Sequence, residues 1–187
     1  SMQQLKKSIL WWGRFDPGYS RSRILRKLLH QDGWAVWDFH PALSPTGDLQ
    51  ALVQGIKKPD LIWVPCCRQR DLAAARRYSR WFGIPLVFDP LISAYDKRVF
   101  EKKKYSPDSA QAACIKRWES RLFQSVDILI ADTEAHRDFF VESLGADPAR
   151  AFVVPVGAED DLFIAQPYGQ PKVRPEVLFY GSFVHLQ

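Results

Sequence analysis

The feature that most constrains the fold is a repeated alternation between short apolar runs and longer amphipathic segments. Six apolar runs are predicted to be strands, at 8–13, 34–40, 59–66, 84–89, 128–132 and 151–157. Each of the first five is followed by a segment whose apolar residues recur with helical spacing. Strands that are apolar throughout and separated by helices require a parallel sheet covered on both faces. We therefore predict an α/β fold with an open, doubly wound, mostly parallel sheet.

The same periodicity predicts which side of each helix faces the sheet. The residues expected to point inward are Ile24, Leu25, Leu28 and Leu29 in the first helix, Leu49, Leu52, Val53 and Ile56 in the second, and Ile115, Trp118 and Leu122 in the helix after the fourth strand. The basic residues Arg21, Arg23, Arg26 and Lys27 are expected elsewhere on the first helix. Residues 90–109 lack a clear period and predict a loop or a short helix.

Composition places the chain among ordinary globular proteins. It has 187 residues, of which 47% are hydrophobic. A chain of this size can bury a hydrophobic core without disulfides or metal ions to stabilise it. Cys66 and Cys67 are adjacent, and Cys114 brings the total to three. Neither an odd number nor this spacing fits a disulfide framework or a zinc site. We expect reduced thiols and no bound metal.

The net charge of +5 and the pI of about 9.2 favour anionic partners. The basic residues spread over several helices instead of lining one face with stacking aromatics, so we expect no nucleic-acid partner. Residues 21–27 and 97–104 carry clusters of Lys and Arg that can meet anionic lipid headgroups; the alternative is a solvated charged face. The sequence has no signal peptide and no long apolar span, which predicts a cytoplasmic protein, either free or peripheral on the inner membrane face.

The turn after the first strand is the first candidate site, because ligands of such sheets bind beyond the carboxyl ends of the strands. Gly13 and Gly18 allow backbone amides to approach a phosphate or a sugar; the alternative is a turn without a ligand. Arg14 can pair with a diphosphate. Phe15 and Tyr19 can stack on a sugar ring or on the apolar part of an acceptor. The alternative is that they belong to a small hydrophobic cluster beside the main core. The glycine spacing lacks the third glycine of a dinucleotide fingerprint, so a nicotinamide cofactor is not expected.

The ends of the other strands supply the remaining candidates. Asp89 follows the fourth strand and can orient or deprotonate an acceptor hydroxyl, which makes it the candidate catalytic residue. Arg68, Ser93 and Asp132 are candidate substrate-binding residues. For Asp89, Ser93 and Asp132 the alternative is a role as a helix cap or turn residue, and for the last strand end either Asp132 or Thr133 is expected to cap the next helix.

The C-terminal part does not fit one closed domain. Residues 165–175 are rich in proline and read as a linker, and 176–187 begin a new apolar strand. We expect an α/β domain over 1–164, a linker over 165–175 and the start of a second domain over 176–187. The alternative is an edge strand that completes the first sheet.

Three passages carry a resemblance to a known family. They are the turn GRFDPGYSRSR at 13–23, the stretch from 126 to 167 that contains VPVGAEDDLF, and the strand VLFYGSF at 177–183. Together they resemble the N-terminal half of a two-domain GT-B glycosyltransferase of glycosyltransferase family 4. The resemblance implies a domain that holds the sugar acceptor and forms one wall of the cleft. It also implies that the nucleotide-sugar donor binds mainly to the second domain, that transfer retains anomeric configuration, and that this half alone is inactive.

Two departures from the family pattern affect the predicted site. The first loop of the family often has adjacent glycines, whereas Gly13 and Gly18 are separated and Pro17 lies between them. Many members have a histidine at the end of the fourth strand, where this chain has Asp89. The alternative function is a non-catalytic flavodoxin-like or nucleotide-binding module. A response-regulator version would need a phosphoacceptor Asp after the third strand, which instead ends in VPCC.

Overall fold

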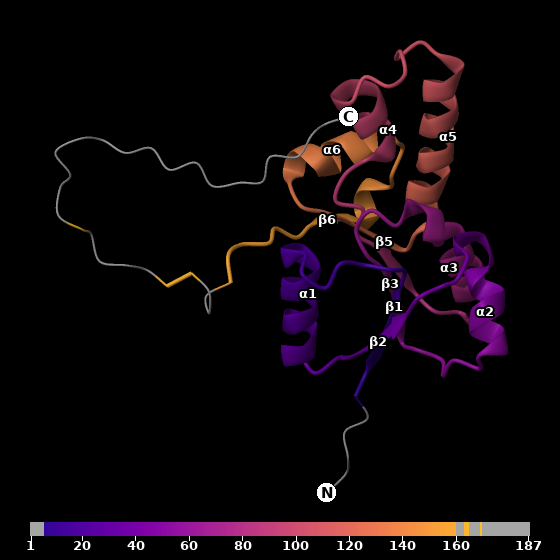
Figure 1. The fold of residues 1–187 in the computed structure, drawn as a ribbon, viewed down its shortest axis with the longest axis vertical. Coiled ribbons are helices and arrows are strands. Elements are labelled where there is room, and N and C mark those ends of the chain that lie inside the picture. The colour runs from indigo at the N-terminus through magenta and orange to yellow at the C-terminus, as the bar shows by residue number, and fades with distance from the viewer. Residues whose placement is uncertain (1–5, 160–162, 165–168, 170–187) are drawn as a thin grey trace, which may run out of the picture. The chain divides into compact units, whose positions relative to one another are not determined.

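The computed structural model describes residues 6–159, 163–164 and 169 (Figure 1). Six strands form one sheet in the order β2-β1-β3-β4-β5-β6, and every neighbouring pair is parallel. The strands are β1 (Ser8–Trp12), β2 (Ala35–Phe39), β3 (Leu61–Val64), β4 (Leu86–Phe88), β5 (Ile128–Ala131) and β6 (Ala151–Val153). The predicted open parallel α/β sheet is confirmed.

Helices connect the strands in the predicted places. They are α1 (Ser20–Gln31), α2 (Gly47–Val53), α3 (Gln69–Phe82), α4 (Ala94–Asp96), α5 (Ala110–Ser125) and α6 (Glu134–Glu142), with short turns η1 (Ser44–Thr46), η2 (Lys97–Glu101) and η3 (Pro148–Arg150). Side-chain caps begin the later helices. Ser109 accepts a hydrogen bond from the Ala112 amide, and Thr133 accepts one from the His136 amide, which satisfies otherwise orphaned N–H groups. The irregular stretch 90–109 contains α4 and the π-helical turn η2.

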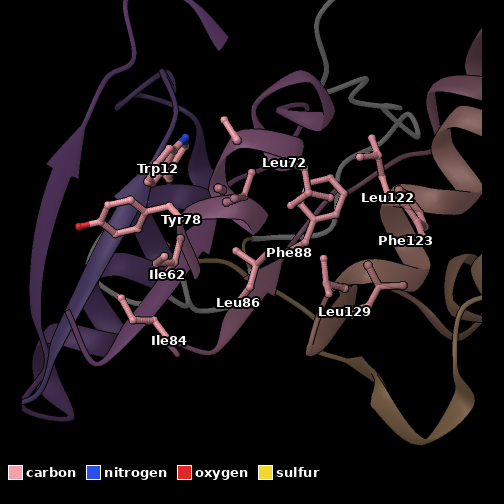
Figure 2. Close-up of a cluster of buried hydrophobic side chains, with 14 of the residues drawn as sticks. Trp12, Ile62, Leu72, Tyr78, Ile84, Leu86, Phe88, Leu122, Phe123 and Leu129 are labelled. Atoms are coloured by element: carbon pink, nitrogen blue, oxygen red, sulfur yellow. The ribbon is translucent and has the colours of Figure 1, made fainter. Parts of the chain in front are cut away.

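The two faces of the sheet carry separate cores. On one face, Trp12 packs against Tyr78 of α3, and Phe88 packs against Phe123 of α5 (Figure 2). On the other face, Leu25 of α1 covers Ile9 and Trp11. Figure 1 shows α1 on one side of the sheet and α2 and α3 on the opposite side. Because both faces are covered, the strands are apolar at nearly every position, as parallel sheets require.

The inward face predicted for α2 is wrong for Leu49, Leu52 and Val53, whereas Ile56, just after the helix, packs against the core as predicted. Leu49, Leu52 and Val53 are exposed by 55%, 42% and 88%, and the buried residues of this helix are Gly47, Asp48 and Ala51. Two tertiary contacts set this orientation. The Asp48 carboxylate accepts a hydrogen bond of 2.7 Å from Arg77 of α3, and a Cβ on Gly47 would lie only 3.1 Å from the Trp12 ring.

The inward faces predicted for α1 and α5 are partly wrong. Leu25 and Leu122 are buried, but Leu28 is 53% exposed and Trp118 is 36% exposed. Arg21, expected off the inward face, is only 4% exposed. Its burial follows from an ion pair described below.

The structure describes only part of the chain over which the domain limits are predicted. The described residues from 6 to 156 form one compact unit. The predicted linker at 165–175, apart from Gly169, and the predicted second-domain start at 176–187 lie outside the described residues.

Two leucines of α1 give a direct check of this packing. Leu25→Ala removes a side chain that is 5% exposed and should lower the free energy of unfolding by about 2–5 kcal/mol, because it leaves a cavity. Leu28→Ala, a matched change one turn away, should alter the same free energy by about 0.5 kcal/mol or less. Urea unfolding followed by circular dichroism measures both. Equal costs would contradict the described orientation of α1.

Candidate functional site

The turn after β1 approaches α3 closely. Gly13 has a φ of +122° and donates a backbone hydrogen bond of 2.9 Å to the Phe39 carbonyl. A Cβ at this position would lie 3.2 Å from Arg68 Cγ and from Asp71 Oδ2. Glycine is therefore required both by the backbone conformation and by the space that Arg68 occupies. Arg68 is held in turn by Asp71, which is fully buried.

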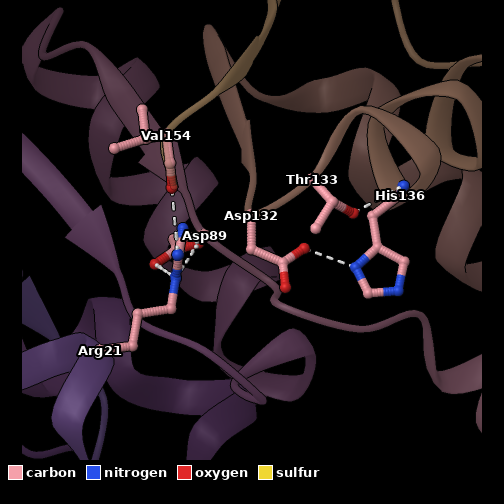
Figure 3. A network of polar contacts seen from close by, with 6 residues as sticks. All are labelled: Arg21, Asp89, Asp132, Thr133, His136 and Val154. Atoms are coloured by element: carbon pink, nitrogen blue, oxygen red, sulfur yellow. Dashed lines mark hydrogen bonds and ion pairs between the residues drawn. The ribbon is translucent and has the colours of Figure 1, made fainter. Parts of the chain in front are cut away.

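The carboxyl ends of the parallel strands form one edge of the sheet, which is called the carboxyl edge below. A buried ion pair lies at its centre. Arg21, in the first turn of α1, donates from Nε and Nη2 to both carboxylate oxygens of Asp89 at 2.8–3.1 Å. Its Nη1 donates to the Val154 carbonyl at 3.2 Å (Figure 3). The side chains are 5% and 3% exposed. One guanidinium thus joins α1, the end of β4 and the segment after β6.

The protonation of Asp89 is set by opposing effects. Burial raises the pKa of Asp89, because the charged carboxylate loses water. The Arg21 guanidinium lowers it again through hydrogen bonds and charge, and the nearby Asp132 carboxylate raises it further. The net result is a raised pKa for Asp89, and Arg21 is the contact that opposes the rise.

Ser93 belongs to a second buried network of hydrogen bonds, which joins the start of α4 to α5. Its hydroxyl donates to Glu119 of α5 and also accepts from the Asp96 amide, which caps α4. The Glu119 carboxylate further accepts from the Ala94 amide at 2.6 Å and from the Tyr95 amide at 3.1 Å. Burial raises the pKa of Glu119, and these hydrogen bonds oppose the rise. The network fixes the start of the segment that follows β4.

Asp132 follows β5 and pairs with a histidine. Its carboxylate lies 2.5 Å from Nδ1 of His136 (Figure 3). The helix cap is Thr133, so Asp132 is left to hold the imidazole. The Asp132 side chain is 23% exposed and that of His136 is 35% exposed. This is the only arrangement among the described hydrogen bonds in which a carboxylate orients an imidazole.

The aromatic residues of the first turn differ in exposure. Tyr19 is 39% exposed. Partial burial raises its pKa, with further contributions from Cys66, Cys67 and Asp132, which lie close to it. Phe15 is half-buried, and its ring lies 5.9 Å from that of Trp11 and 4.7 Å from the Arg26 guanidinium.

The structure thus gathers some predicted residues and separates others. Tyr19, Arg68 and Asp89 lie at the carboxyl edge near the Cys66–Cys67 pair, and Asp132 lies near Tyr19 and Asp89. Arg14 and Gly18 lie on the exposed part of the turn, where the Gly18 amide bonds to Asp16 at 2.8 Å.

Sequence reasoning missed Arg21 and Glu119 as organising residues. A usable signal existed, because Arg21 precedes Leu25 by one helical turn and Glu119 precedes Leu122 by three positions, so each shares a face with a buried leucine.

A surface hollow of about 460 Å³ lies at the amino ends of β4 and β5, on the side of the sheet away from the carboxyl edge. It is lined by Arg76, Ser79, Arg80, Gly83, Ile84, Pro85 and Asp127. Across the described part of the chain, no group of three or more His, Cys, Asp or Glu is arranged to hold a metal ion. No helix in that part is long and apolar enough to cross a membrane.

The model of the glycosyl transferase 4-like domain matches residues 13–157, most of the chain. The chain belongs to this family. The match begins at the glycine turn directly after β1 and ends just after β6, so it covers the strands β2 to β6 and every candidate residue at the carboxyl edge. The predicted family is confirmed.

Solved structures of Anabaena Alr3699/HepE have a similar fold. The complex with UDP has a TM-score of 0.50 at 18% identity, and the complex with UDP-glucose has a TM-score of 0.52 at 17% identity. In both, the similarity covers 83% of this glycosyl transferase 4-like chain and 45% of the other. The chain therefore spans less than half the length of that protein, as expected for the Rossmann-like half of a GT-B glycosyltransferase. No curated protein matches the sequence.

The buried pair and an exposed pair on the same helix provide a matched test. Asp89→Asn leaves the buried Arg21 charge without its counter-ion and should cost about 3–5 kcal/mol of unfolding free energy. Asp38→Asn breaks the Arg26–Asp38 pair, whose side chains are 24% and 43% exposed, and should cost about 1 kcal/mol or less. Denaturant unfolding at neutral pH compares them. Similar costs would mean that Arg21 does not organise this edge.

Proposed function

We propose that this chain is the acceptor-side half of an enzyme that transfers a hexose from a nucleotide sugar to an acceptor hydroxyl. The observation that carries the proposal is the family match over 13–157, which includes the residues Tyr19, Arg68, Asp89 and Asp132 at the carboxyl ends of the strands. In such sheets ligands bind beyond this edge. The second half supplies most contacts to the donor.

The donor we propose is a nucleoside diphosphate sugar. In the reaction, the acceptor oxygen forms a bond to the anomeric carbon, the bond from that carbon to the diphosphate breaks, and the hydroxyl proton leaves the acceptor. We propose that the anomeric configuration is retained and that no metal or other cofactor takes part. Alr3699/HepE was crystallised with UDP-glucose, which supports a uridine diphosphate sugar as the first donor to test.

We assign the proposed substrate contacts from the exposure of each side chain and its place at the carboxyl edge. Tyr19 stacks on the acceptor, because its ring is 39% exposed and it directly precedes α1 at the carboxyl edge. Arg14 is exposed on the same turn and pairs with the diphosphate. Further proposed contacts to the substrates come from Gly13, Phe15, Gly18, Arg68 and Asp132. Ser93 is 2% exposed and its hydroxyl is bonded to Glu119 and Asp96, so we propose that it holds the loop after β4 in place of contacting substrate.

We propose Asp89 as the catalytic residue. Its ion pair with Arg21 limits how it can bind an acceptor hydroxyl. Both of its oxygens accept from Arg21, so a bond to an acceptor hydroxyl would use a remaining lone pair while the guanidinium favours the charged form. Asp132 is more exposed and orients His136. We propose that Asp132 and His136 bind the acceptor beside Asp89.

We propose a cytoplasmic protein that contacts an anionic membrane through the segment after β4, not through α1. Arg21 is buried and Arg26 pairs with Asp38, which removes two cations of α1 from such a surface. Around Tyr95, by contrast, the Phe100 ring lies at 5.7 Å and is 50% exposed, and the Lys116 ammonium also lies at 5.7 Å. The exposed residues Lys102–Lys104 follow directly.

The 187-residue chain alone should release no UDP from UDP-glucose above the uncatalysed rate, because the donor-binding half is required. A coupled assay for UDP, with and without sugar acceptors, measures this. Steady turnover by the chain alone would contradict the division of roles. Tight nucleotide binding without turnover would favour the nucleotide-binding module instead.

In an enzyme that joins this half to its donor-binding half, Tyr19→Ala should raise the KM for the acceptor about tenfold, since stacking contributes about 1 kcal/mol or more. Tyr19→Phe keeps the ring and should stay near the parent value. Initial rates with either substrate varied separate the two constants. A change confined to the KM for the donor would count against Tyr19 as an acceptor contact.

Membrane contact has its own test. Lys102→Glu/Lys104→Glu should weaken binding to phosphatidylglycerol vesicles at least tenfold, because each basic residue near an anionic surface contributes about 1 kcal/mol. Lys57→Glu/Lys58→Glu makes the same charge change at exposed positions before β3 and should have little effect. Vesicle sedimentation gives the affinities. Equal losses in both variants would show that only net charge matters.

A further inference from the structure

The hollow at the amino ends of β4 and β5 lies on the side of the sheet that the proposed sugar transfer does not use. Its volume is about 460 Å³, and its walls are the last turns of α3 and the residues that lead into β4 and β5. Gly83 ends α3 with a φ of +62°, and a Cβ on this residue would meet no atom within 4 Å. The chain therefore turns into β4 without a side chain that fills the space.

Two arginines of α3 line the hollow, and the first of them is held in one orientation. Arg76 Nη1 donates to the Asp127 carboxylate at 2.9 Å and to the Ser79 hydroxyl at 3.3 Å, and the side chain is 19% exposed. Its Nε is buried without a hydrogen-bond partner, and its Nη2 bonds to none of the residues that the structure describes. The protein thus orients this guanidinium but leaves both N–H donors of Nη2 for another acceptor.

The second arginine supplies a cation that the protein does not neutralise. Arg80 follows Arg76 by one helical turn, so the two side chains share a face of α3. Arg80 is exposed and makes no hydrogen bond or ion pair through its side chain within the described part of the chain. Two arginines and one aspartate give the lining a formal charge of +1. Paired guanidiniums with free donors suit a phosphate or a carboxylate.

Two features oppose an anion at this place, and both are weaker than the arginines. Helix α3 ends here, and the negative end of a helix is equivalent to about half an elementary charge. The amides of Gly83 and Ile84 both donate to the Ser79 carbonyl, which engages part of that end. The Asp127 carboxylate is matched by the Arg76 guanidinium, so Arg80 remains as the excess charge.

The second oxygen of Asp127 narrows the class of ligand. Oδ2 accepts both hydrogen bonds of this carboxylate, from Arg76 and from the Leu86 amide at 2.8 Å. Oδ1 accepts none from the described residues, although the side chain is 35% exposed. A free carboxylate oxygen can accept a hydrogen bond from a hydroxyl. A ligand that uses the whole lining therefore carries an anionic group and at least one hydroxyl.

We propose that this hollow binds a small phosphate monoester that carries hydroxyl groups, such as a sugar phosphate. The phosphate lies between Arg76 and Arg80, and a hydroxyl donates to Oδ1 of Asp127. The volume is within the range of about 300–1,000 Å³ that is usual for small-molecule sites. The site is separate from the carboxyl edge, so it does not depend on the proposed transfer reaction.

The test titrates the 187-residue chain with glucose 6-phosphate, inorganic phosphate and glucose, and follows the backbone amides by two-dimensional NMR. The Gly83 and Leu86 signals should shift saturably with glucose 6-phosphate, with a dissociation constant of about 1 mM or lower, as two charge-assisted contacts predict. The Gly13 and Gly18 signals at the carboxyl edge should not shift. Inorganic phosphate should bind several-fold more weakly because it has no sugar hydroxyl for Asp127, and glucose should not bind.

A pair of variants on α3 separates this site from general charge. Arg80→Gln removes an exposed guanidinium from the hollow and should raise the dissociation constant of glucose 6-phosphate about tenfold. Arg70→Gln makes the same change at an exposed position in the first turn of α3, outside the residues that line the hollow, and should leave the constant almost unchanged. Both positions are exposed, so the fold should be retained, and circular dichroism checks this.

Four outcomes would overturn the proposal. In the parent chain, these are no saturable shift at Gly83 and Leu86, shifts at Gly13 and Gly18 in their place, or equal affinities for inorganic phosphate and glucose 6-phosphate. In the variants, an equal loss of affinity in Arg70→Gln and Arg80→Gln would show that net charge alone attracts the ligand. The first three are read from the unmodified sequence and need no variant to fold.

Discussion

The buried pair of Arg21 and Asp89 is the contact on which the carboxyl edge depends. A carboxylate at the end of a central strand loses its water when helices cover the sheet, and without a counter-ion its charged form would be strongly disfavoured. Arg21 supplies that counter-ion and also holds the Val154 carbonyl. One side chain therefore sets the relative positions of the first helix, the fourth strand end and the segment after the sixth strand.

The sheet makes this arrangement rigid. Trp11 stacks on Trp63 at 5.3 Å across β1 and β3, and on the opposite face Trp12 packs against Phe39 at 4.6 Å. Large rings on neighbouring strands leave little freedom in register, because a slip by one residue would exchange the two faces. The ends of β1, β2 and β3 are thus fixed relative to one another, which is what a site built from separate loops requires.

Function at this edge combines fixed and exposed parts. The networks of Glu119 and Asp89 are buried and hydrogen-bonded, so they define where the turns lie. Tyr19, Cys67 and the Asp132–His136 pair are the groups that solvent reaches. These exposed groups are the ones that the proposed acceptor would meet.

The sequence by itself determined the strands, the parallel sheet and the family, because apolar runs separated by amphipathic segments leave few other folds and the glycine turn and the passage around VPVG are local patterns. Only the tertiary structure decided which helix faces are buried: α2 turns its leucines outward because Asp48 meets Arg77 and Gly47 meets Trp12. It also decided that Arg21 is a buried partner and not a surface cation, since its counter-ion lies 68 residues away. Such choices depend on contacts between distant segments, which no local period encodes.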